Sequence, residues 1–264
     1  MDLQLKNKTA FISGSTAGIG FAIAKALLSE GATVIINGRS QKNLDAAIKQ
    51  LKNLVPNAKV SGIVADFRNP GAMDLIQQKI DQVDILINNL GIYASKSFEE
   101  TSHDEWQEMF NVNVMASVNL TRYFMPKMRT TNWGRIIFIS SECAQLVPDD
   151  LIAYSTTKAA LLALSRGLAQ TTKGSNVTVN ALVPGSTLTE GAQEFLKNQA
   201  KTEQRSEEEI ADDFFKKVRT TSLLQRFAYP KEIADMAVFL ASPLSSATNG
   251  AAIKVDGGSV PGIL

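Results

Sequence analysis

Six short apolar segments, rich in β-branched residues, alternate with longer segments of helical spacing. They span residues 9–13, 33–37, 60–64, 85–88, 135–140 and 177–182. A strand that is apolar at nearly every position is buried on both faces, as in a parallel sheet covered by helices on each side. Because crossovers between parallel strands are right-handed, the pattern predicts a doubly wound α/β sheet.

The intervening segments carry the signals of helices that bury one face. In the first of them apolar residues recur at helical spacing, at Ile19, Ala22, Ile23, Ala26 and Leu27. Gly31 follows where a helix C-terminus belongs, and residues 44–51 repeat the spacing in the next segment. Pro70 after Asn69 predicts a further helix that begins at the proline.

Composition excludes several classes of function. Lysine and arginine number 27 and aspartate and glutamate 26, so the chain lacks the strong positive charge of proteins that bind nucleic acid or anionic membranes. Its single cysteine, Cys143, cannot form an intramolecular disulfide, and a zinc site would have only that cysteine and one histidine to draw on. That histidine, His103, lies between Ser102 and Glu105, which have capping-box spacing, so we expect it in the first turn of a helix.

The 264 residues predict a single domain, with residues 186–222 as an insertion. No signal peptide and no apolar run of membrane-spanning length is visible, so we expect a cytoplasmic protein without a membrane partner. The insertion is charged and helix-forming where a short connection would be enough. Its place at the carboxyl edge of the sheet favours a substrate lid, and a solvated pair of surface helices is the alternative.

A glycine-rich turn joins the first predicted strand to the first helix. It reads Ser13-Gly14-Ser15-Thr16-Ala17-Gly18-Ile19-Gly20. Glycines permit a tight turn and let the backbone approach a pyrophosphate, and the helix N-terminus offers free N–H groups to that phosphate. The turn therefore predicts a dinucleotide site.

This turn and the motifs that follow it resemble the classical short-chain dehydrogenase/reductase family. The resemblance runs from residue 8 to residue 258 and rests, in order, on the glycine turn, Asp66, Asn88-Asn89-Leu90-Gly91, Asn113, Ser141, Tyr154-x-x-x-Lys158, Pro184-Gly185-x-x-x-Thr189 and Val255-Asp256-Gly257-Gly258. It implies a Rossmann-type sheet of about seven strands in the order 3-2-1-4-5-6-7. It also implies an NAD(P)-dependent oxidoreductase that interconverts carbonyl and alcohol groups, similar to 3-oxoacyl-carrier-protein reductases.

Tyr154 and Lys158 are four residues apart and would share one face of a helix. A free phenol has a pKa of about 10, and a nearby ammonium and a positively charged nicotinamide both favour the phenolate, so we expect a lowered pKa for Tyr154. Tyr154 would then give a proton to a carbonyl oxygen, or take one from an alcohol. Ser141 would hydrogen-bond the same oxygen and hold it for hydride transfer.

Two other positions compete for these roles. Tyr123 and Lys127 have the same spacing, but no serine stands thirteen residues before Tyr123, and Pro126 should disturb the helix between them. The resemblance gives a fourth catalytic role to Asn113, which would hold a water in a proton relay to the lysine. Asn111 is a nearby rival, although Asn113 fits the family's frame better.

The end of the second strand bears on the choice of cofactor. NAD-binding relatives usually carry a carboxylate at the position of Gly38 to accept from the ribose 2′-hydroxyl, and here the nearest carboxylate is Asp45. Arg39 would instead attract a 2′-phosphate through charge-assisted hydrogen bonds. The sequence therefore favours NADP(H). NAD(H) stays open because Ala17 stands where NADP-using members often have a second basic residue.

The resemblance also assigns the other cofactor contacts. Besides Arg39 they are Gly14, Ser15, Thr16, Gly18, Ile19, Gly20, Asp66, Phe67, Asn89, Gly91, Tyr154, Lys158, Pro184, Gly185 and Thr189. Asp66 matches the residue that binds the adenine amino group, and Lys158 matches the one that binds the nicotinamide ribose. Thr189 matches a contact to the carboxamide and equally suits a helix N-cap. Leu90 replaces the family's usual small residue, so we expect local adjustment near the adenosine ribose.

By resemblance, the substrate contacts are Tyr93, Ser141, Cys143, Leu146 and Tyr154, with Ile92, Gln145, Val147, Leu151 and the 186–222 segment around them. Most of these residues are apolar, which favours a medium-sized or lipophilic carbonyl compound. Cys143 and Gln145 stand where relatives often have small residues, and they either reshape the pocket or only pack. Relatives assemble through two long helices, expected here over residues 102–128 and 150–171, which implies a homotetramer or homodimer.

Two other functions stay open alongside an NAD-dependent alcohol dehydrogenase. A non-catalytic dinucleotide sensor would have no need of the Ser141, Tyr154 and Lys158 trio, which argues against it. Non-redox relatives such as epimerases and dehydratases belong mainly to an extended branch of the family, with a larger C-terminal domain.

Overall fold

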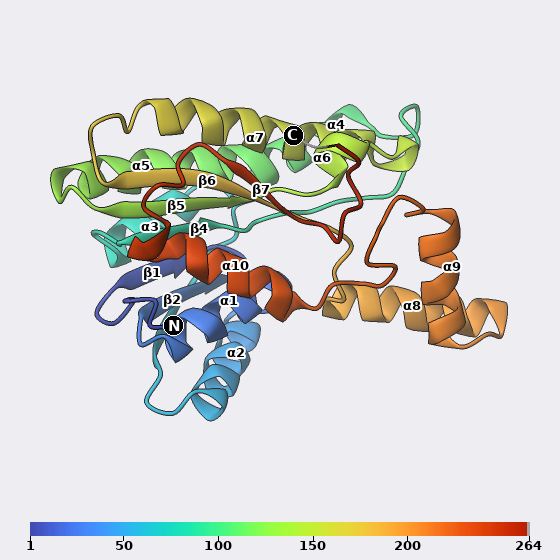
Figure 1. The fold of residues 1–264 in the computed structure, drawn as a ribbon, viewed down its shortest axis with the longest axis horizontal. Coiled ribbons are helices and arrows are strands. Elements are labelled where there is room, and N and C mark those ends of the chain that lie inside the picture. Colours follow the sequence, from blue (N-terminus) through green and yellow to red (C-terminus); the bar gives the residue numbers. More distant parts are fainter. Residues whose placement is uncertain (263–264) are drawn as a thin grey trace.

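A computed structural model describes residues 1–262 and shows one parallel sheet between two layers of helices (Figure 1). The strands are β1 (Thr9–Ile12), β2 (Thr33–Gly38), β3 (Lys59–Val64), β4 (Ile85–Asn88), β5 (Gly134–Ile139), β6 (Val177–Pro184) and β7 (Ala252–Val255). Their order is β3-β2-β1-β4-β5-β6-β7, and every neighbouring pair is parallel. The predicted sheet and strand order are confirmed, and each of the six apolar segments forms a strand.

Each face of the sheet is covered by its own helices and its own apolar core (Figure 1). One layer consists of α1 (Gly18–Ser29), α2 (Gln41–Leu54) and α10 (Pro230–Ala241). The other consists of α3 (Ala72–Lys79), α5 (Ala116–Thr130) and α7 (Ile152–Gln170). The central strands β4, β5 and β6 are buried along their whole length, whereas the edge strands β3 and β7 are partly exposed, because only a central strand has neighbours on both sides.

The remaining elements lie at the ends of the sheet or beyond it. They are α4 (His103–Phe110), a π-helix (Asn111–Met115), α6 (Cys143–Leu146), 3₁₀ turns (Asp149–Leu151 and Pro243–Ser245), α8 (Glu190–Glu203) and α9 (Glu207–Lys217). Figure 1 shows α8 and α9 standing away from the two main layers, at the right of the view. Within residues 1–262, no helix combines the length and the apolar character needed to cross a membrane.

Three local expectations from the sequence meet different outcomes. Ser102 and Glu105 form the predicted capping box at the start of α4. The helix expected at Pro70 begins instead at Ala72, because Gly71 caps it in the left-handed region at φ 86°. The expectation for Pro126 is wrong as well, since α5 continues through it to Thr130.

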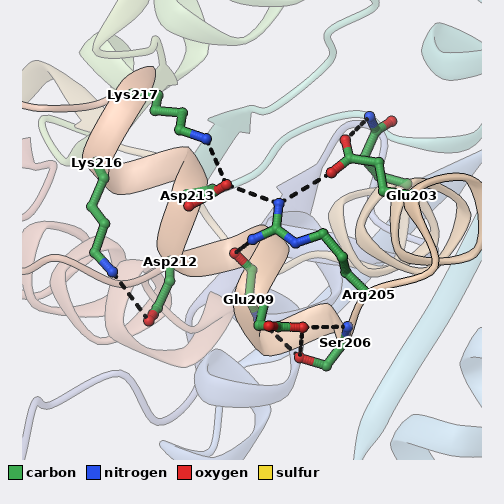
Figure 2. A network of polar contacts seen from close by, with 9 residues as sticks. Glu203, Arg205, Ser206, Glu209, Asp212, Asp213, Lys216 and Lys217 are labelled. Atoms are coloured by element: carbon green, nitrogen blue, oxygen red, sulfur yellow. Dashed lines mark hydrogen bonds and ion pairs between the residues drawn. The ribbon is translucent and has the colours of Figure 1, made fainter.

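The turn between α8 and α9 is held by a network of charged side chains (Figure 2). Arg205 donates to Asp213 at 2.8 Å and to Glu203 at 3.1 Å, and Lys217 pairs with the same Asp213 at 2.7 Å. Ser206 forms a capping box at the start of α9. These groups are exposed or half-exposed, so each pair contributes little individually. Leu196 and Ala200 of α8 also pack against Ile210 of α9.

The core between the sheet and α5 yields a prediction about stability. Phe124 is fully buried there and lies 6.0 Å from Phe11 between ring centroids. Replacing Phe124 with alanine should lower the free energy of unfolding by about 3–5 kcal/mol, because it removes buried apolar area and leaves a cavity. Phe195, 51% exposed on α8, provides the matched control, and Phe195→Ala should change stability by less than about 1 kcal/mol. Urea denaturation measures both, and equal losses would contradict the assignment of the core.

Candidate active site

Parallel strands bring the segments that follow them to one edge of the sheet. The strand order reverses between β1 and β4, so the chain leaves these two strands in opposite directions and opens a crevice at their carboxyl ends. The glycine turn follows β1, and Asn89 to Gly91 follow β4. Ser141 lies two residues beyond the end of β5, and Gly185 follows β6.

The glycine turn is as close-packed as a phosphate cradle requires. Gly18 adopts a φ of 59°, which favours glycine. A Cβ on Gly20 would lie 2.5 Å from Asn89 Nδ2 and 2.7 Å from the Gly14 carbonyl oxygen, so no other residue fits. Asn89 Nδ2 donates to the carbonyls of Ser13 at 3.1 Å and Gly14 at 2.8 Å, which ties the β4 end to the turn.

A cavity of about 270 Å³ opens beside this turn, at the ends of β2 and β3. Its lining residues are Gly14, Thr16, Ala17, Asn37, Gly38, Arg39, Ala65, Asp66, Phe67, Arg68, Asn89, Leu90, Gly91, Ile92 and Val112. Arg68 Nε contacts both carboxylate oxygens of Asp66, at 3.0 and 3.1 Å. The hydrogen bond from Arg68 is the main reason that the pKa of Asp66 falls below its usual range. Sequence reasoning missed Arg68, because a pairing two residues away has no distinctive spacing.

A second cavity, of about 250 Å³, continues from the first past Asn89 and Gly91. Its lining residues are Ile19, Asn89, Gly91, Tyr93, Ile139, Ser140, Ser141, Tyr154, Lys158, Pro184, Gly185, Thr187 and Thr189. Ser141 comes from the end of β5, whereas Tyr154 and Lys158 lie one turn apart on α7. The structure therefore brings the three predicted catalytic side chains to one cavity, which we call the catalytic cavity.

Burial dominates the electrostatics of Tyr154 and Lys158. It raises the pKa of the Tyr154 phenol, an effect that the hydrogen bond with Ser141 partly opposes. It also lowers the pKa of Lys158 to about 8. Lys158 Nζ lies 5.6 Å from the centroid of the Tyr154 ring and donates to the Ile139 carbonyl at 2.9 Å. Desolvation of the phenolate therefore acts against the lowered pKa expected for Tyr154. That expectation also included the positive charge of a nicotinamide, and it stays a prediction.

Asn113 sits in the π-helix between α4 and α5, and such irregular turns often occur at functional sites. Its Oδ1 accepts from the Ile92 amide at 2.8 Å, and its Nδ2 donates to the Ile92 carbonyl at 2.9 Å and to Thr157 Oγ1 at 3.0 Å. Asn113 thus links the loop after β4 to the helix of Tyr154. The rival Asn111 is exposed, and its side-chain oxygen accepts from Gln107, on the preceding turn, at 3.3 Å, so the geometry favours Asn113.

The second tyrosine–lysine pair has a structural role. The Tyr123 hydroxyl donates to the Ile80 carbonyl at 3.0 Å, and Lys127 pairs with Asp81 at 2.8 Å. Neither residue lines the two cavities at the sheet edge.

Comparison with known proteins decides the family. The short chain dehydrogenase family matches residues 8–200. The chain belongs to the short-chain dehydrogenase/reductase family. It is 44% identical over 263 residues to an uncharacterized oxidoreductase, YvrD, of Bacillus subtilis, covering 98% of this chain and 99% of that one. It is 34% identical over 262 residues to the 3-oxoacyl-[acyl-carrier-protein] reductase FabG of Aquifex aeolicus, with 98% and 99% covered.

Solved structures extend the comparison. The L-sorbose reductase of Gluconobacter frateurii, complexed with NADPH and L-sorbose, superposes with a TM-score of 0.93 at 31% identity over the whole of both chains. This short-chain dehydrogenase/reductase is accordingly an NAD(P)-dependent oxidoreductase that acts on alcohol and carbonyl groups.

The predicted substrate contacts of this dehydrogenase/reductase divide into two groups. Tyr93 lines the catalytic cavity beside Tyr154, with 5.8 Å between the ring centroids. Cys143 and Leu146 lie in α6 and do not line that cavity. Cys143 is buried, and burial raises the pKa of its thiol, so it is not a reactive thiolate. Val147, with a φ of 43°, ends α6 and turns the chain toward α7.

The start of the 186–222 segment contacts the glycine turn directly. The Gly18 amide donates to Glu190 Oε2 at 2.8 Å. Glu190 is the first residue of α8, and Thr189 caps this helix while also lining the catalytic cavity, so both roles suggested for Thr189 are compatible. The amide that opens α1 therefore already binds an anionic oxygen, which is the chemistry that a pyrophosphate requires.

This contact predicts competition between Glu190 and the cofactor. Glu190→Gln should lower the Kd for NADPH by roughly two- to fivefold, because it removes a negative charge worth about 0.3–1 kcal/mol at the helix terminus where the pyrophosphate would bind. Fluorescence titration with NADPH measures the effect. Glu194→Gln, on an exposed position one turn further along α8, is the control and should leave the Kd unchanged. Weaker binding by Glu190→Gln would show instead that the carboxylate helps to hold the cofactor.

Proposed function

We propose that this protein is an NADP(H)-dependent reductase of carbonyl compounds, working in reverse as an alcohol dehydrogenase, with Tyr154 as the general acid and base. The supporting observation is the shared cavity of Ser141, Tyr154 and Lys158, which continues into the cavity beside the glycine turn. A sensor would need only the cavity beside the glycine turn. We therefore favour catalysis over binding without turnover.

The chain's residues fit a dinucleotide along these two cavities. The glycine turn would hold the pyrophosphate, Arg39 and Asp66 the adenosine end, and Lys158 and Thr189 the nicotinamide end. When bound, the cofactor supplies the hydride for reduction or takes it up in oxidation.

Proton transfer follows from the burial of Tyr154. A phenol with a raised pKa is fully protonated near neutral pH, so it is ready to donate to the carbonyl oxygen during reduction. Ser141 hydrogen-bonds the same oxygen, and the Lys158 ammonium stabilises the phenolate left behind. Oxidation needs the phenolate, so its rate should rise with pH until the phenol has ionised. Asn113 supports the Ile92 loop and Thr157, and a water that it holds would return the proton through Lys158.

Charge at the adenosine end supports NADP(H). Arg39 lines the cavity beside Gly38, and its charge contributes to the lowered pKa of Asp66, after the larger effect of Arg68. Arg39 thus offers a guanidinium group to a 2′-phosphate, whereas the guanidinium of Arg68 is paired with Asp66 and Ala17 offers no basic group. The L-sorbose reductase with the same fold was solved with NADPH. NAD(H) is the alternative cofactor.

The catalytic cavity supports a small polar ketone. Six of its lining residues carry hydroxyl groups, namely Tyr93, Ser140, Ser141, Tyr154, Thr187 and Thr189. Those of Ser140 and Thr187 donate to the backbone carbonyls of Lys158 and Gly185. This lining is more polar than the substrate region expected from the sequence. Solved relatives include an L-sorbose reductase and a putative gluconate 5-dehydrogenase of Beutenbergia cavernae. We therefore propose a hydroxylated ketone of sugar size, ahead of a lipophilic one, with the 186–222 segment as its lid.

Assembly and location complete the proposal. A groove between α5 and α7 is almost wholly apolar, lined by Val118, Met125, Pro126, Leu164 and Leu168 among others. Such a groove suits association of these helices with a second copy, so we propose a homodimer or homotetramer.

We also propose a cytoplasmic location, because soluble NADP(H) is supplied there.

Removing one hydroxyl tests the assignment of Tyr154. Tyr154→Phe should lower kcat for ketone reduction by about 10²–10⁴-fold, because the general acid is lost while the ring still packs against Tyr93. NADPH oxidation followed at 340 nm with hydroxylated ketones gives the rate, and NADPH binding should be retained. Tyr123→Phe is the matched control and should keep activity. A fully active Tyr154→Phe variant would end the acid–base assignment.

Cofactor choice is tested at Arg39. Arg39→Ala should raise the Kd for NADPH by roughly 10- to 100-fold, since a charge-assisted hydrogen bond is worth about 1.5–3 kcal/mol, and should leave the Kd for NADH unchanged. Titration of both cofactors measures the difference. Arg122→Ala, exposed on α5, controls for a general loss of positive charge. An equal effect on both cofactors would contradict a 2′-phosphate contact.

A further inference from the structure

Glu142 follows Ser141 directly and is almost fully buried, with 2% of its surface exposed. Its backbone amide donates to the Pro184 carbonyl at 2.8 Å, which extends the pairing of β5 with β6 beyond the strands. Burying a carboxylate costs free energy unless it is paired, so the partners of Glu142 indicate its role.

Both ends of the 186–222 segment meet at one oxygen of this carboxylate. Arg219 Nε donates to Glu142 Oε1 at 2.9 Å, and Ser186 Oγ donates to the same oxygen at 2.9 Å. Ser186 begins the segment and Arg219 lies near its end, just after α9. The Arg219 side chain is itself only 10% exposed, and its Nη2 lies 3.7 Å from Cys143 Sγ.

The other carboxylate oxygen, Oε2, is buried and has no hydrogen-bond partner among residues 1–262. The negative charge of Glu142 therefore depends on the contacts at Oε1. Loss of Arg219 would leave a buried charge held by one serine hydroxyl, which is a far less stable arrangement.

We propose that Glu142 is a positioning residue, which with Arg219 and Ser186 forms a clamp that fastens both ends of the 186–222 segment to the strand end carrying Ser141. The clamp sets the cavity wall, because Ser186 lies between Gly185 and Thr187, which both line the catalytic cavity. This inference rests on the proposed function, in which Ser141 and Tyr154 act on the substrate.

The clamp also sets the charge near Tyr154. The groups that face the phenol are Lys158 on its own helix, Tyr93 from the loop after β4, and Ser141, Glu142 and Cys143 from the end of β5 and α6. The charge of Glu142 acts to raise the pKa of Tyr154, and Arg219 offsets that charge through the ion pair. Removing Arg219 alone should therefore make the phenolate harder to form than in the wild type.

Four variants separate positioning from a merely structural role. Arg219→Met should lower kcat/KM for ketone reduction by about 10²-fold, since small displacements of positioning groups have effects of this size. It should also shift the pH dependence of alcohol oxidation to higher pH. Glu142→Gln should shift the pH dependence of alcohol oxidation to lower pH. The double variant Glu142→Gln with Arg219→Met should restore the midpoint to near the wild-type pH, because it contains no unpaired charge. Arg219→Lys keeps the charge and should recover part of the activity.

Arg205→Met provides the control. This arginine is also ion-paired within the 186–222 segment, but at the exposed outer turn of Figure 2, and its loss should change kcat/KM by less than about twofold. Wild-type kcat/KM and an unshifted pH profile in Arg219→Met would overturn the clamp.

Limited trypsin digestion gives a readout that does not depend on turnover. Cleavage within residues 190–217 should be faster in Arg219→Met than in the wild type or Glu142→Gln, and NADPH should still bind.

If the wild type reduces no ketone, the proposed function fails, whereas faster cleavage in Arg219→Met would still support the clamp. If Arg219→Met does not fold, the cleavage rates of the double variant and of Arg219→Lys are compared with that of the wild type instead. Equal cleavage rates in every variant would overturn the proposal.

Discussion

The site depends on the parallel sheet and on the reversal of its strand order between β1 and β4. All strands end at one edge, so residues as far apart as Gly18, Ser141 and Gly185 meet there without any long-range signal in the sequence. The turn after β1 is tied to the end of β4 by Asn89, which leaves little freedom for either segment. A rigid edge of this kind lets loops vary in chemistry while the positions of the reacting groups stay fixed.

Within that edge, desolvation determines which charge states Tyr154 and Lys158 favour. Burial disfavours the charged form of each group, so it keeps the phenol protonated and brings the pKa of the ammonium down to about 8. The Ile139 carbonyl holds Lys158 Nζ at 2.9 Å, and this contact partly replaces the lost hydration. In the proposed reaction, the protonated phenol would donate a proton, and its phenolate would be favoured by an additional positive charge, of the kind that an oxidised nicotinamide carries.

The sheet was predictable because strands buried on both faces must be apolar throughout, and this signal needs no knowledge of partners. Local helix details were less predictable. The left-handed conformation of Gly71 makes α3 begin after Gly71 rather than at Pro70. The missing N–H of Pro126 does not end α5, because local packing accommodates it. Motif order led to Ser141, Tyr154 and Lys158, which do share a cavity. The direction of the Tyr154 pKa required the degree of burial, and the pairing of Glu142 with Arg219 joins residues 77 positions apart, so neither could be obtained from spacing.

Two carboxylates, those of Glu190 and Glu142, connect the 186–222 segment to the site, and they differ in solvent exposure. Glu190 is exposed and binds the Gly18 amide, a contact for which we expect the pyrophosphate to compete. Glu142 is buried and binds Arg219 and Ser186, contacts that water does not reach easily. A segment fixed firmly at its base and loosely at the glycine turn can release the cofactor site while its base stays aligned with Ser141. That difference in burial, rather than the number of charged residues in α8 and α9, is what supports the proposal that the segment acts as a lid.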